Sequence, residues 1–134
     1  MIACSKNTII IIILFFVFSN SDSEELECQG AKLRVINKIT TELVYYDIPL
    51  YQTLDLDNAK IKIFKCVKLE EDSRDDEIAL LSHKLNSDTR QKAFLGWVFR
   101  SSQYLNSPLN PFYDIKLEKC LLKDPIFLKK SYSK

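Results

Sequence analysis

The sequence predicts an all-β domain, a small sandwich or partly open barrel of about six or seven mainly antiparallel strands with at most one short helix. The first observation that predicts this fold class is a series of short segments in which apolar and polar residues alternate. Turn-forming residues separate these segments. Hydrophobic residues make up 46% of the 134-residue chain, which is enough to build the core of one domain.

The first expected strands form a hairpin. Residues 31–37 (AKLRVIN) alternate, with the apolar side chains on one side and the basic ones on the other. A polar turn at 37–42 leads to residues 43–48 (LVYYDI), which are rich in β-branched and aromatic residues. Pro49 ends this second strand or marks a sheet edge.

Two further strands and one ambiguous segment follow. Residues 51–58 indicate a short strand and a turn, and residues 59–69 indicate a long strand with lysines facing outwards. Residues 73–86 carry a capping pattern and helical spacing, but the same residues also alternate. The residues at 77–85 could therefore be helix or strand.

The stretch TRQKAFLGWVFR at 89–100 is expected to be a strand. Alternation places Trp97 on the side of Leu95 and Phe99, and we expect this side to face the core, with a ligand-stacking indole as the alternative. Gly96 lies on the other side, where a missing side chain would admit a ring, a backbone or a bulge. A loop with two prolines at 101–111 precedes a last strand at 112–120.

The N-terminus has the pattern of a secretory signal peptide. Lys6 precedes an apolar run at 8–18, and small residues follow the run. A membrane-spanning helix needs about 20 apolar residues, more than this run provides. We expect residues 1–21 to be removed on export to the periplasm, with cleavage before Asp22 or, alternatively, before Glu24, leaving no transmembrane span.

The mature chain then divides into a leader at 22–29, a β domain at 30–120 and a basic tail at 121–134. The formal net charge of +1 lacks the strongly basic surface of a nucleic-acid-binding protein, so we expect no nucleic acid as a partner. The tail is expected to be a frayed basic end. Its alternative role is a weak, salt-sensitive peripheral contact with an anionic envelope surface.

Three cysteines remain after cleavage, in a compartment where disulfides persist. Cys66 and Cys120 each fall in phase with the charged residues of their strands, so both would lie on the polar side unless a bulge intervenes. Two thiols with the same facing could bridge neighbouring strands or strand ends, a link worth about 4 kcal/mol on the chain-entropy model. Cys28 could be free, bonded to another chain or part of a flexible leader. Zinc would need a fourth ligand, and the CxxC spacing is absent, so we expect no metal and no cofactor.

If the protein has a recognition surface, the loop 101–111 is where we expect it, because loops on a rigid β scaffold usually carry binding. The expected contributors lie in this loop or next to it in the sequence: Trp97, Ser101, Ser102, Tyr104, Asn106, Asn110, Tyr113 and Asp114. For Asp114 a hydrogen bond to a backbone amide of the loop is the structural alternative.

The sequence offers little for catalysis. His83 is the sole histidine, and no nucleophile-elbow motif surrounds the serines, so we expect a structural histidine. The acids gather in EEDSRDDE at 70–77, which we expect to be a solvated loop, since it lacks the spacing of a calcium loop and of a glycosidase pair. A small periplasmic hydrolase that uses His83 or Asp114 is the alternative to a non-catalytic protein.

Several blocks follow one another in an order that resembles a known family. Lys38 and Thr40 lie in the first turn, Cys66 ends the long strand, GWVFRSS occupies 96–102, and a Pro-aromatic-Tyr-Asp block leads to Cys120. Over residues 30–120 this order resembles domain of unknown function family 2155, found in exported proteins of alphaproteobacteria. The resemblance implies a β domain with a Cys66–Cys120 disulfide, and it implies no activity.

The chain departs from that family's pattern at four positions. Thr41 and Tyr51 stand where the family usually has glycine, Asn110 replaces a histidine and Lys116 replaces a tryptophan. If the family's histidine performed chemistry, this chain has lost it. We therefore expect an exported, disulfide-linked β domain that acts as a binding or structural module of the bacterial cell envelope, with an unknown envelope protein or polymer as its partner.

Overall fold

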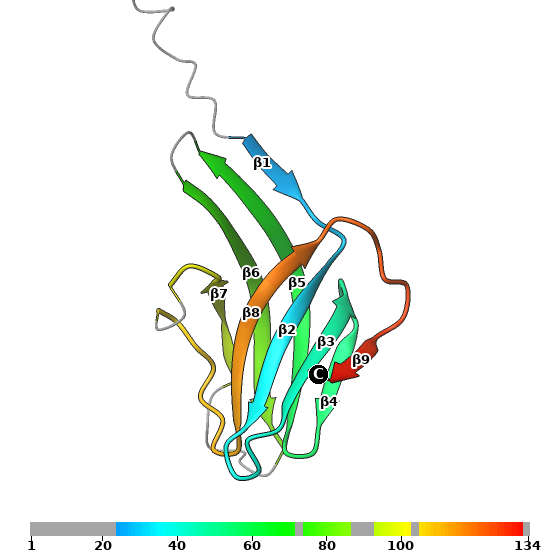
Figure 1. Ribbon diagram of the computed structural model, residues 1–134, viewed down its shortest axis with the longest axis vertical. Helices are drawn as coiled ribbons and strands as arrows, with labels where there is room; N and C mark the ends of the chain where they lie inside the picture. The colour runs from blue at the N-terminus through cyan, green and yellow to red at the C-terminus, as the bar shows by residue number, and fades with distance from the viewer. Residues whose placement is uncertain (1–23, 72–73, 87–92, 103–104, 133–134) are drawn as a thin grey trace, which may run out of the picture.

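The computed structural model describes residues 24–71, 74–86, 93–102 and 105–132, and these residues form two antiparallel sheets that face each other (Figure 1). The strands of the first sheet are β1 (Glu24–Glu27), β4 (Thr53–Leu56), β5 (Ala59–Glu71), β6 (Arg74–Leu85) and β7 (Phe94–Phe99). The strands of the second sheet are β2 (Gly30–Asn37), β3 (Leu43–Pro49), β8 (Tyr113–Leu121) and β9 (Lys129–Tyr132). The predicted all-β class is confirmed.

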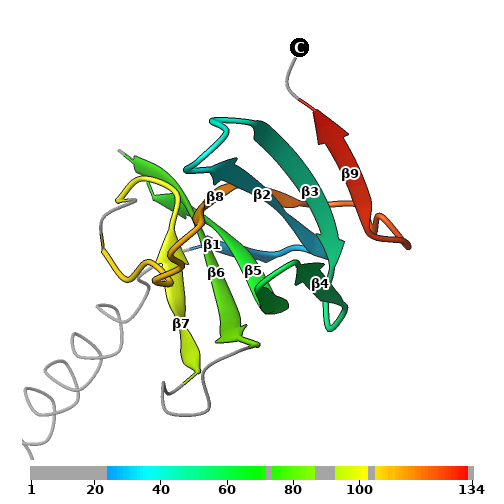
Figure 2. The same cartoon turned by 90° about the horizontal axis from the view of Figure 1, so that it is seen from below.

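The order of strands places the longest hairpin at the centre of the first sheet. The path is β1-β5-β6-β7, and β4 pairs with the start of β5 while β1 pairs with its end. The second sheet runs β8-β2-β3-β9. Figure 2 shows the two layers end-on, with β7 at one side of the molecule and β9 at the other. No helix that could span a membrane occurs in the residues described above.

Two strands lie outside the domain limits that the sequence indicated. β1 falls in the expected leader and pairs with β5 from Glu24↔Glu70 to Glu27↔Val67. β9 falls in the expected basic tail and pairs with β3. Both segments gain order because they complete the backbone hydrogen bonding of a sheet edge, a contribution that local sequence pattern does not reveal.

The ambiguous segment at 77–85 belongs to strand β6. It pairs with β5 on one side and with β7 on the other, so its backbone groups are satisfied by two neighbours. Ala79, Leu81 and His83 alternate inwards and are buried. The segment forms a strand despite its helical pattern, because a central strand in this position buries one complete face and completes two hydrogen-bond ladders.

The acidic stretch at 70–77, expected to be a solvated loop, consists mainly of strand. β5 continues to Glu71 and β6 begins at Arg74, so the hairpin connection is short. One of its acids, Glu77, is buried. The composition of this stretch therefore gave a wrong prediction for residues 70–71 and 74–77, because two long paired strands carry these residues into the sheet.

The core fills the space between the inner faces of the two sheets. Its largest fully buried side chains come from both layers: Leu33, Ile48, Ile61, Ile63, Leu81 and Leu117, with Cys66 among them. Apolar side chains of this size contribute roughly 1.5–3 kcal/mol each when fully buried. In residues 31–37 and 59–63, the apolar side chains predicted to face inwards are therefore the ones buried in the core.

Strand β7 faces the other way from the prediction. Val98 is buried in the core and Phe94 packs against it, whereas Trp97 lies on the outer face opposite Leu80 of β6. Leu95, on the same outer face as Trp97, is 65% exposed. The expectation that the indole would form the centre of the core is wrong, because β7 is an edge strand with hydrophobic residues on both faces.

Gly96 allows an aromatic ring to approach, as predicted. A Cβ added at this residue would lie 3.1 Å from Cζ of Phe94, the ring on the same inner face. This distance is tighter than ordinary van der Waals contact. The glycine therefore lets the Phe94 ring lie over the strand and close the edge of the core.

Candidate functional site

The described part of the chain places a disulfide between the two sheets. It joins Cys66 of β5 to Cys120 of β8, with the Cα atoms 5.6 Å apart. The predicted pairing is confirmed, but the predicted facing is not. Both cysteines lie on the inner faces, and the bond crosses from one sheet to the other instead of linking neighbouring strands.

A β-bulge before each cysteine explains the difference. In β5, Ile63 and Lys65 pair with consecutive residues of β6, so Phe64 between them is the extra residue. In β8, Leu117 and Lys119 pair with consecutive residues of β2, so Glu118 between them is the extra residue. An extra residue shifts the alternation of all later side chains by one position. Two bulges therefore turn both cysteines from the polar side to the core.

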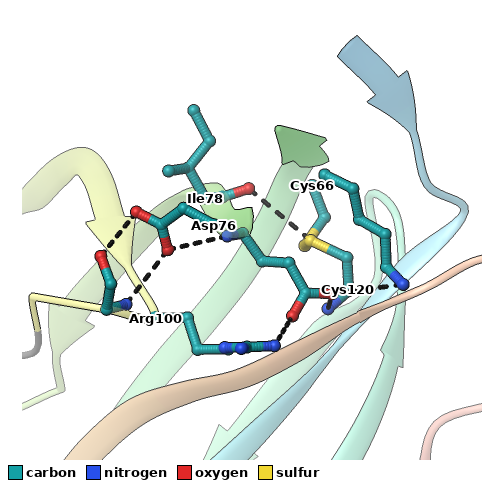
Figure 3. A network of polar contacts seen from close by, with 8 residues as sticks. Cys66, Asp76, Ile78, Arg100 and Cys120 are labelled. Atoms are coloured by element: carbon teal, nitrogen blue, oxygen red, sulfur yellow. Dashed lines mark hydrogen bonds and ion pairs between the residues drawn. A yellow bond between two sulfur atoms is a disulfide. The ribbon is translucent and has the colours of Figure 1, made fainter. Parts of the chain in front are cut away.

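A buried carboxylate lies beside this disulfide. Glu77 of β6 is 5% exposed, and its Oε2 accepts a hydrogen bond from the Arg100 guanidinium. Its Oε1 lies 3.7 Å from Nζ of Lys68 and accepts a hydrogen bond from the Cys120 amide at 3.1 Å. Burial of a carboxylate is costly unless charges and donors compensate it, and Glu77 has both. Figure 3 shows this network next to the sulfur atoms.

A second carboxylate extends the network towards the end of β7. Oδ1 of Asp76 accepts hydrogen bonds from the amides of Glu77 and Ser101 at 2.8 and 3.1 Å, and its Oδ2 accepts one from the Ser101 hydroxyl at 2.6 Å (Figure 3). We refer to the following residues together as the Glu77 cluster: Lys68, Asp76, Glu77, Arg100 and Ser101, with the Cys66–Cys120 disulfide.

The Glu77 cluster connects strands from both sheets. Lys68 comes from β5, the two acids from β6, Arg100 and Ser101 from the residues after β7, and the Cys120 amide from β8. Both cations contact the Glu77 carboxylate, whereas the Asp76 carboxylate accepts hydrogen bonds from neutral amide and hydroxyl donors. These hydrogen bonds and ion pairs surround the disulfide, and they hold the end of β7 close to β8.

Sequence reasoning found only part of this cluster. Ser101 and both disulfide cysteines were expected to matter, whereas Glu77 and Arg100 were missed. A usable signal existed for Glu77, since it shares its phase with Ala79 and Leu81 on β6. An acid in phase with core residues must find partners or remain uncharged.

His83 belongs to a different cluster, with two asparagines. The side chain of Asn110 exchanges hydrogen bonds with Asn58 at 2.9 and 3.1 Å, and its Nδ2 lies 3.1 Å from Nε2 of His83. Oδ1 of Asn110 also accepts hydrogen bonds from the amides of Phe112 and Tyr113 at 2.9 and 3.1 Å. The cluster therefore ties the start of β8 to the turn before β5 and to β6.

This network fixes the role of the imidazole. The donors around Oδ1 of Asn110 require its Nδ2 to point at His83, so Nε2 of the ring accepts a hydrogen bond. His83 is 3% exposed, and burial lowers the pKa of its imidazole below the ordinary value of 6.5. A buried ring whose lone pair is engaged by Asn110 is consistent with the structural histidine that the sequence predicts.

The other expected recognition residues lie on β7 and in the loop that follows it. Trp97 lies on the outer face of β7. The backbone carbonyl of Ser102 accepts a 3.1 Å hydrogen bond from the Leu105 amide. Asn106 is exposed, with a left-handed φ of 49° that asparagine tolerates. Tyr104 lies outside the described residues. A single surface that combines them stays a prediction.

The last two expected residues lie on opposite faces of β8. Tyr113 packs against the core, and its hydroxyl donates to Oδ2 of Asp57 at 3.4 Å. Asp114 pairs with Ile36 on the outer face, and its Oδ2 lies 3.6 Å from Nζ of Lys116. Asp114 therefore faces away from the inner side of the sandwich, where His83 lies.

One recess in the described part of the chain lies close to these residues. A recess of about 10 Å³ lies between β7, β8 and the loop that joins them, and it is lined by residues such as Val98, Leu105 and Leu117. One water molecule would fill such a volume, whereas small-molecule sites are usually about 300–1,000 Å³. Within the described ranges no three His, Cys, Asp or Glu side chains gather as potential metal ligands.

Comparison with known families decides the identity of the domain. Residues 31–120 match the model of a family described as "Uncharacterized protein conserved in bacteria (DUF2155)". The chain belongs to this family. No curated protein and no solved structure matches the chain. The DUF2155 match spans β2 to β8 and ends at Cys120, so it includes the disulfide, the Glu77 cluster and the His83 cluster.

Proposed function

We propose that this member of the DUF2155 family is an exported, non-catalytic module that binds or supports a component of the bacterial cell envelope. The Cys66–Cys120 disulfide is the observation that carries the proposal, since such bonds persist in oxidising compartments such as the periplasm. The charged and apolar pattern of the first 21 residues supports the same compartment.

The polar clusters support a scaffold in preference to an enzyme. In the two clusters, the Glu77 carboxylate and the Asn110 side-chain carbonyl are engaged by donors that hold strand ends. A hydrolase would need a nucleophile, a base and room for substrate within hydrogen-bond reach of one another. His83 and Asp114, the residues of the enzymatic alternative, lie on inner and outer faces of different sheets.

Export is tested by producing the full chain in a bacterium and measuring the mass of the protein in the periplasmic fraction. We expect a product that lacks residues 1–21 or 1–23 and contains the Cys66–Cys120 disulfide. A matched control carries Leu14→Arg in the apolar run, which should leave the chain unprocessed in the cytoplasm. An intact N-terminus on the periplasmic wild-type protein would contradict the proposal.

The non-catalytic role is tested in a host that lacks its own copy of the gene. A His83→Gln/Asp114→Asn variant that folds should restore the wild-type phenotype, because neither residue performs chemistry. A photo-crosslinking residue at Trp97, with Lys119 on the other sheet as a control position, then identifies envelope components near the expected recognition surface. Failure of the folded double variant to restore the phenotype would favour the hydrolase.

A further inference from the structure

A third cysteine lies next to the disulfide in the core. Cys28, between β1 and β2, is 2% exposed and belongs to the same buried cluster as Cys66 and Cys120. Its thiol is free. The expectation that this cysteine could lie in a flexible leader is therefore wrong, because the chain around it continues the sheet.

The strand register places Cys28 directly opposite Cys66. The ladder between β1 and β5 ends with Glu27 paired with Val67, and the same register extended by one residue brings Cys28 opposite Cys66. The Cys28 amide donates a 2.8 Å hydrogen bond to the Cys66 carbonyl, as this register requires. Opposed residues of an antiparallel pair share a face and have Cα atoms about 4.5–5.5 Å apart, within the range that a disulfide spans.

We propose that Cys28 is an alternative partner of Cys66, so that the domain can hold its disulfide either between the sheets or at the edge of the first sheet. The exchange needs no external oxidant. The thiolate of Cys28 attacks Sγ of Cys66, the Cys28–Cys66 bond forms as the Cys66–Cys120 bond breaks, and Cys120 leaves as a thiolate. Cys120 then takes up a proton from solvent to replace the one that Cys28 released.

The exchange changes what the covalent bond holds together. The Cys66–Cys120 bond ties β8 of the second sheet to β5 of the first and closes a loop of 54 residues. A Cys28–Cys66 bond would close a shorter loop and tie β5 to the segment that leads from β1 into β2. After the exchange β8 remains paired with β2, but its covalent tie to the first sheet is gone.

Burial makes the internal thiol the favoured attacker and also limits its rate. Cys66 and Cys120 are buried, so an external thiol has poor access to the bond. Burial raises the pKa of the Cys28 thiol, the Lys68 ammonium of β5 lowers it, and the Glu77 carboxylate of β6 raises it further. Exchange is therefore slow at neutral pH and accelerates about tenfold per pH unit while the thiol is mostly protonated.

Cys28 lies outside the part of the chain that matches the DUF2155 family. The match begins at residue 31, whereas Cys66 and Cys120 lie inside it. The inter-sheet bond thus belongs to the family domain. The alternative partner belongs to the segment that precedes it in this chain.

Two single variants test the geometry. Cys120→Ser leaves Cys28 and Cys66, which should form a disulfide in the monomer on mild oxidation. Cys66→Ser leaves Cys28 and Cys120, which are not opposed in the ladders that the structure describes and should stay reduced under the same conditions. Non-reducing peptide mapping by mass spectrometry gives the linkage. Equal oxidation of both variants, or none in a folded Cys120→Ser protein, would overturn the proposal.

The wild-type protein provides a measurement that does not depend on how those variants fold. The native oxidised protein is held at pH 7 or at pH 9, quenched in acid, unfolded and alkylated, and the labelled cysteine is mapped. We expect the label on Cys28 alone at pH 7 and a fraction transferred to Cys120 at pH 9, with no label on Cys120 in Cys28→Ser. Labelling of Cys28 alone at both pH values refutes the exchange.

Discussion

Replacement of Glu77 is expected to destabilise the domain in two distinguishable steps. Glu77→Gln keeps an oxygen that can accept the Cys120 amide but removes the charge that faces Arg100 and Lys68. Loss of one partner from a fully buried ion pair costs about 3–5 kcal/mol. The Arg100 and Lys68 side chains are 47% and 33% exposed, so water can resolvate them and the expected loss is only about 1 kcal/mol.

Glu77→Ala adds a second penalty. The Cys120 amide lies in a buried residue and would lose its acceptor, which costs about 1–3 kcal/mol for an unsatisfied buried donor. The total expected for alanine is therefore about 3 kcal/mol. For a domain of this size that corresponds to a fall in melting temperature of roughly 10 °C or more.

Urea unfolding of the oxidised protein, followed by fluorescence of Trp97, measures both changes. Asp75→Asn on the same strand is the matched control, because Asp75 is exposed and its replacement should change the free energy of unfolding by less than about 0.5 kcal/mol. If glutamine and alanine cost the same, the amide contact does not contribute as argued. If neither exceeds the control, the Glu77 cluster does not stabilise the domain.

Two further predictions concern backbone strain and pH. Thr41 has a φ of 62°, a left-handed conformation that is costly for a β-branched residue. Thr41→Gly should therefore raise the free energy of unfolding in urea by up to about 1 kcal/mol, whereas Thr40→Gly next to it should lower it. Equal losses for both would contradict the strain argument. Burial lowers the pKa of His83, so the unfolded chain binds this proton more readily than the folded one, and the free energy of unfolding should fall as the pH drops below about 6.5. The pH dependence of the urea midpoint in His83→Gln should lack this component, and identical slopes would refute it.

The departures of this chain from the family pattern have a physical explanation at two positions. The structure gives Thr41 and Tyr51 φ values of 62° and 66°, in the region that glycine adopts without steric cost. These are the two positions where the family resemblance implies glycine. Both turns therefore have a backbone conformation that suits the glycine implied by the family resemblance, and each side chain adds strain.

Part of the candidate site could be predicted because its signals are local. The strands that carry Cys66 and Cys120 and the close approach at Gly96 follow from residue type and alternation. Glu77 was missed because its stretch is acidic, and acidic composition usually indicates a solvent-exposed loop. The partners that make its burial tolerable, Lys68 and Arg100, lie on other strands and become visible only in the folded structure.

The sequence by itself determined the all-β class and the positions of the central strands, because alternation and turn chemistry act over a few residues. The pair of cysteines that join was implied by the family resemblance of the sequence. The tertiary structure decided which face of each strand lies inside. The bulges at Phe64 and Glu118 reverse the facing of both cysteines, and β7 buries Val98 while Trp97 stays outside. These choices depend on how one sheet packs against the other, and period-two alternation is the same whichever face is buried.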